Sequence, residues 1–319
     1  MRVKIRKHSD GGKGIGSGSA SRGRFTMAGA APDPRAASDP GAAPGSRAAS
    51  DPRVSHDDGR PHGGRGIFEA LLLAAVPIAM GVALVAGFAQ TALFMMLVVT
   101  VVLALFFASY EASKPALRQI MPTLVLAALA AAGRILFAPI PDFKPVSAIA
   151  IIAGATLGRR SGFMVGALAA FASNFFFGQG LWSPWQMYAW GLIGYLGGVL
   201  ADRGVFPDAS ASREHRVNGK DGDSAPLASR VGRSERAKAV LLVAFGLLSG
   251  LLYGMVINAY GVLGFVRPLT VPGAIAYVAA SLPFDVVHGV ATAVFLLVLY
   301  RPWTLRIARV VRKFDVRCR

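Results

Sequence analysis

The chain has 319 residues, of which 54% are hydrophobic and 16% charged, and its mean hydropathy is +0.50. This composition excludes an ordinary soluble protein, because soluble domains carry more charged and fewer apolar residues. The formal charge of +17 is compatible with binding to nucleic acid or to anionic membrane lipids, and the positions of the basic residues distinguish the two.

The first 66 residues are rich in Gly, Ala, Ser, Pro and Arg and contain no apolar run. The hexapeptide RAASDP occurs in them twice, at 35–40 and 47–52. A segment of this composition cannot bury enough apolar surface to fold. We predict that residues 1–66 form a disordered, basic cytoplasmic tail.

Eight apolar segments follow, most of them near the roughly 20 residues that a helix needs to cross a bilayer. They lie at 67–88, 91–110, 119–138, 145–158, 161–177, 184–201, 239–260 and 276–300. We therefore predict an all-α, polytopic integral membrane bundle. In it, residues 67–110 form two extra transmembrane helices, and residues 111–301 form a six-helix core with a disordered cytoplasmic insertion at 202–238. Residues 302–319 form a basic cytoplasmic tail.

The 34 Lys and Arg residues sort by side of this predicted membrane. All but Arg134, Lys144 and Arg267 lie in the two tails, the 202–238 insertion, or the short loops on the same side. Basic residues accumulate on the cytoplasmic side of membrane proteins. We predict a multi-pass cell-membrane protein with both termini cytoplasmic, which meets anionic lipid headgroups and no nucleic acid.

The sequence NFFFGQGLWSPWQ joins the fifth and sixth apolar segments and combines aromatic rings with amides. An interfacial aromatic belt explains Trp182 and Trp185. It explains Asn174, Gln179 and Gln186 less well, because amides near an apolar zone need hydrogen-bond partners. This turn is the predicted place for a small ligand, on the extracellular face.

Charged groups inside the apolar segments are few, and each is costly unless it is paired or hydrated. Arg134 lies near the outer end of the third segment, where Asp142, Asn174, an anionic ligand or the lipid headgroups can meet it. Asp285 and His288 are three residues apart and share a helix face, as a structural pair or as a proton relay.

The loop PIPDFKP at 139–145 has three prolines and carries Phe143. Proline fixes φ and prevents helix geometry, which predicts a stiff extended lid over the outer face. No phosphate loop, HExxH zinc motif, catalytic triad or dinucleotide fingerprint occurs, and Cys318 is the single cysteine. We expect no enzyme activity, no cofactor and no metal.

Three stretches carry a resemblance to a known family: AALAAAGR at 127–134, GRILFAPIPDFKPVSAIAIIAGATLG at 133–158, and SGFMVGALAAFASNFFFGQGLWSPWQMYAWGLIGYLGGVL at 161–200. They are similar to the substrate-binding (S) component of energy-coupling factor transporters. The resemblance implies a six-helix subunit that captures a vitamin or its precursor outside the cell. The subunit then topples in the membrane while docked to a transmembrane T component, which two ATPase subunits drive.

The resemblance also implies site residues. The docking surface for the T component falls on Ala127, Ala128, Ala131 and Ala132. Together with the arguments above, we expect the substrate to contact Arg134, Asp142, Phe143, Asn174, Gln179, Trp182, Trp185, Gln186 and Tyr260. The aromatic turn is similar to that of the subgroup associated with cobalamin, and its width would also suit riboflavin or a quinone-like molecule.

Two other classes of function stay open. A membrane-embedded enzyme acting on a lipid-linked substrate would use Asp285, His288 and Arg134 as its polar centre, although such enzymes usually show clustered acids or a metal motif. A structural or assembly protein would bind anionic lipid or ribosomes through its basic termini.

Overall fold

The computed structural model describes residues 63–86, 91–113, 117–207 and 225–316. Within these ranges the chain forms helices and no strand, so the prediction of an all-α fold is confirmed. The predicted disordered tail lies outside the described residues at 1–62, but its last residues, 63–66, are helical, so the prediction is wrong there. Residues 208–224 of the predicted insertion also lie outside the described residues, as does Cys318.

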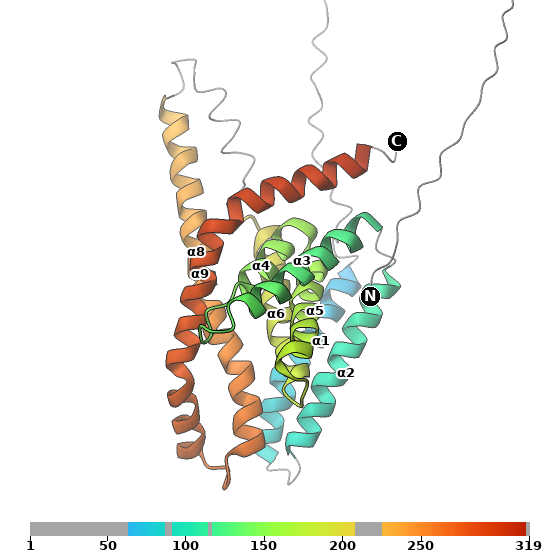
Figure 1. The fold of residues 1–319 in the computed structure, drawn as a ribbon, viewed down its shortest axis with the longest axis vertical. Helices are drawn as coiled ribbons and strands as arrows, with labels where there is room; N and C mark the ends of the chain where they lie inside the picture. Colours follow the sequence, from blue (N-terminus) through green and yellow to red (C-terminus); the bar gives the residue numbers. More distant parts are fainter. Residues whose placement is uncertain (1–62, 87–90, 114–116, 208–224, 317–319) are drawn as a thin grey trace, which may run out of the picture. The chain divides into compact units, whose positions relative to one another are not determined.

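Each of the eight predicted apolar segments lies almost entirely within one helix (Figure 1). The helices are α1 (Gly63–Ala86), α2 (Thr91–Ala112), α3 (Leu117–Leu136), α4 (Val146–Leu157), α5 (Arg159–Phe177), α6 (Ser183–Asp202), α8 (Ala225–Phe265) and α9 (Val271–Val316). Their side chains form two buried apolar clusters, one centred on α4 and the other between α1, α2 and α6.

The last two helices are longer than the sequence predicts. α8 begins at Ala225, so residues 225–238 of the predicted insertion are helical. α9 continues through the predicted basic tail to Val316, with Pro302 inside it, and Figure 1 shows that its direction changes along its length. Both extensions are rich in Arg, a good helix former. Apolar hydropathy marks only the part of a helix that faces lipid or core, so it underestimated both lengths.

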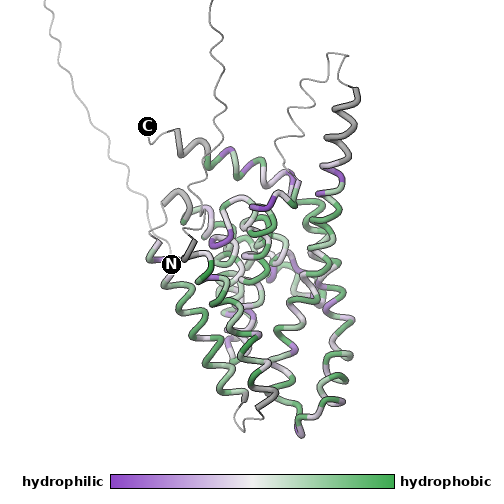
Figure 2. The backbone as a smooth tube through the Cα atoms, turned by 180° about the vertical axis from the view of Figure 1, so that it is seen from behind, coloured by the Kyte–Doolittle hydropathy of each residue, from purple (hydrophilic) through white to green (hydrophobic). Residues whose placement is uncertain are grey.

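Three helical stretches in the described ranges are long and apolar enough to cross a membrane: Ala92–Ala112, Ser234–Phe265 and Val271–Val311. Figure 2 shows green apolar runs along α2 and α8, and purple residues in the C-terminal part of α9. Shorter apolar stretches occur at Gly66–Val82, Ile120–Leu136 and Val146–Leu157. This pattern is consistent with a membrane protein.

Glycines allow α4, α5 and α6 to pack backbone against backbone. A Cβ atom at Gly154 or Gly162 would meet the carbonyl oxygen of Gly194, and one at Gly166 would meet the carbonyl of Trp190. Small residues at helix crossings permit such close approach in membrane bundles. This close packing at glycines holds α5 and α6 in a defined register.

The N-terminal helices α1 and α2 are attached to this packed unit by polar contacts as well as apolar ones. Glu69 of α1 is 2% exposed and forms an ion pair with Arg160 of α5. The Tyr188 hydroxyl of α6 donates a hydrogen bond to the carbonyl oxygen of Leu73, at 2.6 Å. These contacts make α1 part of the bundle's interior packing.

Candidate functional site

A buried arginine at the end of α3 is the centre of the most connected polar group in the described chain. Arg134 is 8% exposed. Its Nη1 donates to Ser173 Oγ at 2.7 Å and to Asn174 Oδ1 at 2.6 Å, and its Nη2 donates to Gln186 Oε1 at 3.4 Å. We call Arg134, Ser173, Asn174, Ser183 and Gln186 the Arg134 cluster.

The amides of the cluster also bond to one another. Asn174 is fully buried, and its Nδ2 donates to Ser183 Oγ at 3.1 Å and to Gln186 Oε1 at 2.9 Å. The Ser183 hydroxyl in turn accepts the backbone N–H of Gly180 at 3.1 Å. These bonds tie the end of α5 to the start of α6, which explains why an apolar region tolerates the amides.

Aromatic rings cover the guanidinium of the cluster. Its Cζ atom lies 4.6 Å from the ring centre of Phe177 and 4.8 Å from that of Trp190, both within cation–π range. Trp190 also stacks on Tyr253 of α8 at 4.8 Å, and the Tyr253 side chain hydrogen-bonds to Gln186. The cluster is therefore joined to α8 as well as to α3, α5 and α6.

The loop between α3 and α4 supplies the charges nearest to the cluster. Burial raises the pKa of the Asp142 carboxyl, and the positive charges of Lys144 and Arg134 oppose this rise. Burial lowers the pKa of the Lys144 ammonium, which Asp142 partly offsets. Among the described residues no carboxylate forms an ion pair with Arg134. Neutral hydrogen-bond acceptors and aromatic ring faces therefore stabilise its positive charge.

A comparison with protein families adds one finding. Residues 113–313, more than half of the chain, match a family of unknown function, DUF6580. The chain belongs to this family. No curated protein and no solved structure gives a significant match. The DUF6580 region contains the whole Arg134 cluster and leaves α1 and α2 outside it.

Of the nine residues predicted to contact substrate, the DUF6580 fold brings three into direct hydrogen bonding: Arg134, Asn174 and Gln186. Asp142 lies close enough to interact electrostatically with Arg134. Phe143 instead packs on α9, with its ring 5.3 Å from that of Phe295.

The predicted aromatic wall does not gather around Arg134. Trp185 is 2% exposed and packs in the core beside α1 and α2, with its ring 6.0 Å from Tyr260. Trp182 is 40% exposed, and Gln179 is exposed and donates to a backbone carbonyl of α5 at 2.9 Å. Neighbouring residues of a helix point about 100° apart, so Trp185 and Gln186 face different parts of the bundle.

Asp285 and His288 share a helix face but bond to different helices. Asp285 Oδ2 accepts from Asn258 Nδ2 at 3.2 Å and from Ser281 Oγ at 3.5 Å. His288 Nε2 lies 2.7 Å from Ser147 Oγ of α4. In the described ranges no three acidic, His or Cys side chains gather to hold a metal ion. The proposed joint action of the two residues has no direct contact to support it.

Several residues of the site were not predicted from the sequence. Trp190 follows Gln186 by one helical turn and so shares its face of α6. This spacing in the sequence could have predicted that Trp190 belongs to the site. Ser173 adjoins Asn174, and Ser183 opens α6. Tyr253 gave no local signal, because its role depends on α8 packing against α6.

The predicted docking alanines divide between two faces of α3. Ala127 is 5% and Ala131 is 6% exposed, whereas Ala128 and Ala132 are exposed. Residues one apart on a helix cannot share a narrow face, so the four do not form one outward surface. Ala128 and Ala132 alone remain available to a partner.

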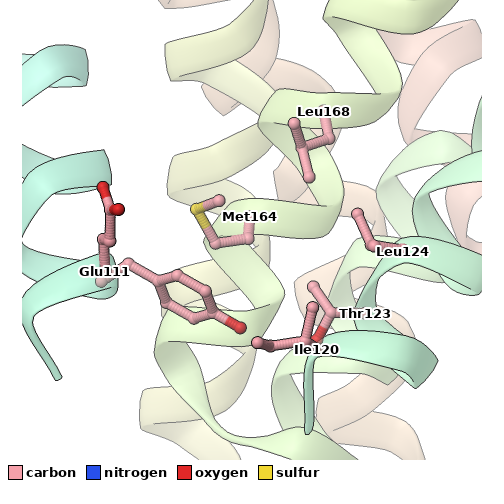
Figure 3. Close-up of a pocket in the computed structure, with 7 residues that line it drawn as sticks. Glu111, Ile120, Thr123, Leu124, Met164 and Leu168 are labelled. Carbon is pink, nitrogen blue, oxygen red and sulfur yellow. The ribbon is translucent and has the colours of Figure 1, made fainter. Parts of the chain in front are cut away.

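A separate cavity of about 360 Å³ lies between α2, α3 and α5 (Figure 3). Its lining residues are Tyr110, Glu111, Ile120, Thr123, Leu124, Met164 and Leu168. Most of them are apolar, and none was predicted to contact substrate. The Tyr110 hydroxyl is buried without a hydrogen-bond partner among the described residues.

Proposed function

We propose that the protein is the substrate-capture subunit of an energy-coupling factor transporter, which binds a vitamin or a vitamin precursor from outside the cell. The observation that carries this proposal is the Arg134 cluster. It places several fixed hydrogen-bonding groups beside aromatic faces, the combination with which proteins orient small molecules.

The arrangement of helices supports a six-helix core. The DUF6580 match begins just after α2 and ends within α9, so it spans α3, α4, α5, α6, α8 and α9. In this proposal α1 and α2 are two additional membrane helices, and the whole chain crosses the membrane eight times. The resemblance of residues 127–200 to S components is a second, independent support.

The distribution of charge supports an extracellular site. The Tyr300 hydroxyl donates to the carbonyl oxygen of Pro207 at 3.3 Å, so the basic end of α9 lies beside the C-terminal end of α6. Gln186 lies in the first turn of α6, which ends at Asp202, and so about 24 Å from that end. Because basic ends face the cytoplasm, the Arg134 cluster belongs near the outer side.

In the proposed cycle, ligand reaches the cluster past the 139–145 loop and the turn between α5 and α6. Ligand groups then replace part of the amide bonding between Asn174 and Gln186. The loaded subunit docks to a T component through the exposed face of α3 at Ala128 and Ala132, and two ATPase subunits drive the release. Cobalamin is one candidate ligand from the resemblance.

The competing enzyme function is less well supported by the contacts. It needs Asp285, His288 and Arg134 to act as one centre. Asp285 is bonded to Asn258 and Ser281, and His288 to Ser147. These contacts satisfy each group separately and leave Arg134 outside both.

The ligand test is equilibrium binding of a vitamin panel, cobalamin and riboflavin included, to the purified full chain. We expect one compound to bind at one site per chain. Uptake of that compound should then require the T component and its ATPases. Absence of binding across the panel, together with absence of association with any T component, would contradict the proposal.

The orientation test uses two exposed positions in a Cys318→Ser background. We expect Gln179→Cys, at the α5–α6 turn, to react with a membrane-impermeant thiol reagent in intact cells. Arg306→Cys, in the basic end of α9, should react only after permeabilisation. Both side chains are exposed, so a difference in labelling reports the side of the membrane. The opposite pattern would overturn the extracellular site.

A further inference from the structure

Two buried nitrogen donors next to one another have no hydrogen-bond partner among the described residues: Nε of Arg134 and Nε1 of Trp190. The two side chains are 8% and 2% exposed, and the guanidinium carbon lies 4.8 Å from the centre of the indole ring. Buried N–H groups are nearly always paired in folded proteins, because an unpaired one loses its bonds to water. These two donors are therefore available to an acceptor from a ligand.

The acceptors that are present are all neutral. The two terminal nitrogens of Arg134 donate to a serine hydroxyl and to the carbonyl oxygens of two amides. Neutral side chains accept hydrogen bonds from the guanidinium but do not balance its charge, and a buried charge without a counter-ion is costly. The described side chains thus leave two donors unpaired and the positive charge unbalanced.

The neighbouring ionisable groups do not supply that charge. Asp142 interacts with Arg134, yet it lies next to Lys144, whose positive charge it also feels, and the two side chains offset each other. Asp285 is bonded to Asn258 and Ser281 on α8 and α9. Buried His288 faces Ser147. The surroundings of the guanidinium therefore keep an excess of positive charge.

We infer that the ligand of this site carries an anionic group, a carboxylate or a phosphate, whose oxygens accept from Arg134 Nε and from Trp190 Nε1. Two oxygens on one carbon or phosphorus atom suit two adjacent donors, and an ionised acceptor strengthens both bonds. Phe177, whose ring lies 4.6 Å from the guanidinium carbon and is 39% exposed, covers the guanidinium on one side, and its displacement opens that group to solvent. The inference rests on the proposed function only for the statement that this anion is the transported substrate.

The test uses sodium acetate and inorganic phosphate as probes on the full chain in lipid nanodiscs, at constant ionic strength set with chloride. Tryptophan fluorescence and the unfolding temperature are the two readouts. We expect a saturable response to at least one of the probes in the parent protein. Trp190→Phe keeps an aromatic ring and removes the N–H donor, and it should weaken the response by roughly tenfold, the usual effect of losing one such bond.

Arg134→Gln should abolish the response, and Arg267→Gln, which removes an exposed arginine from the α8–α9 loop, should leave it unchanged. If Arg134→Gln does not fold, Trp190→Phe still tests the inference, because it leaves the charge unchanged and keeps an aromatic ring at that position. An unchanged response in Trp190→Phe would overturn the inference. So would a response that appears only in Asp142→Asn, because Asp142 would then be the internal anion.

The failure of this inference is distinguishable from that of the proposed function. A saturable anion response without any vitamin uptake would leave the anion site standing and overturn the transporter. A neutral vitamin that binds equally well to the parent and to Trp190→Phe would support the transporter and overturn the anion site.

Discussion

The Arg134 cluster and the cavity between α2, α3 and α5 differ in almost every property. The cluster is buried, polar and joined by side-chain bonds to four helices. The cavity has a volume of about 360 Å³ and a largely apolar lining that includes residues of α2, outside the DUF6580 region. Ligand specificity comes from a few placed polar groups, and empty space alone does not provide it. The cluster is therefore the better candidate for the ligand site, although its residues do not line this cavity.

The largest effect is expected from Trp185→Ala, which tests how far the ligand site extends beyond the cluster. Trp185 is 2% exposed in the core beside α1 and α2. Its removal should lower the free energy of unfolding by about 3–5 kcal/mol, as for other buried aromatic residues. The folded fraction should bind the panel ligand as the parent does. Weakened binding by protein that is still fully folded would extend the ligand site to the aromatic turn.

Arg134→Gln should reduce binding of the panel ligand by roughly a hundredfold or more, because bonds to charged groups contribute about 1.5–3 kcal/mol each. The matched control is Leu124→Ala, which changes the lining of the cavity at a side chain that is 49% exposed. Its affinity should match that of the parent protein in isothermal titration. A greater loss in Leu124→Ala would assign the ligand to the cavity instead.

The two faces of α3 should respond differently to a large side chain. Ala131→Trp should destabilise the fold by about 1–3 kcal/mol, because that position is 6% exposed and overpacking is costly. Ala128→Trp lies on the exposed face, so folding and ligand binding should be retained while coupled uptake fails. Thermal unfolding and uptake in cells would measure both. Normal uptake with Ala128→Trp would show that this face is not the docking surface.

The smallest of these effects is expected from Asn174→Ala. The Asn174 side chain bonds to three members of the cluster, and its removal leaves those groups short of partners. We expect binding to weaken roughly tenfold, which corresponds to about 1.4 kcal/mol. Gln179→Ala is the control, since its side chain is exposed and bonds only to a backbone carbonyl. Equal losses in both variants would place the ligand at the turn surface and not at the cluster.

Sequence reasoning identified three members of the cluster for one physical reason. Arg134, Asn174 and Gln186 are polar groups in apolar surroundings, and such groups must find partners wherever the chain folds. Trp185 and Gln179 were predicted with them because they lie in the same aromatic turn of the sequence. The direction in which each side chain leaves α6 or the end of α5 decides whether it reaches Arg134, the exposed surface or the apolar cluster beside α1 and α2.

The apolar runs alone determined that the chain is helical, where each helix lies and that several helices suit a membrane, because hydrogen bonding within each segment is a local property. The apolar runs did not predict where α8 and α9 begin and end, because the terminal turns of these helices are polar. Tertiary structure decided which faces of the helices meet. It divided Ala127 from Ala128, bound His288 to Ser147 and not to Asp285, and brought Tyr253 to the cluster. These outcomes depend on helix rotation and close packing at glycines, which arise only when distant segments come together.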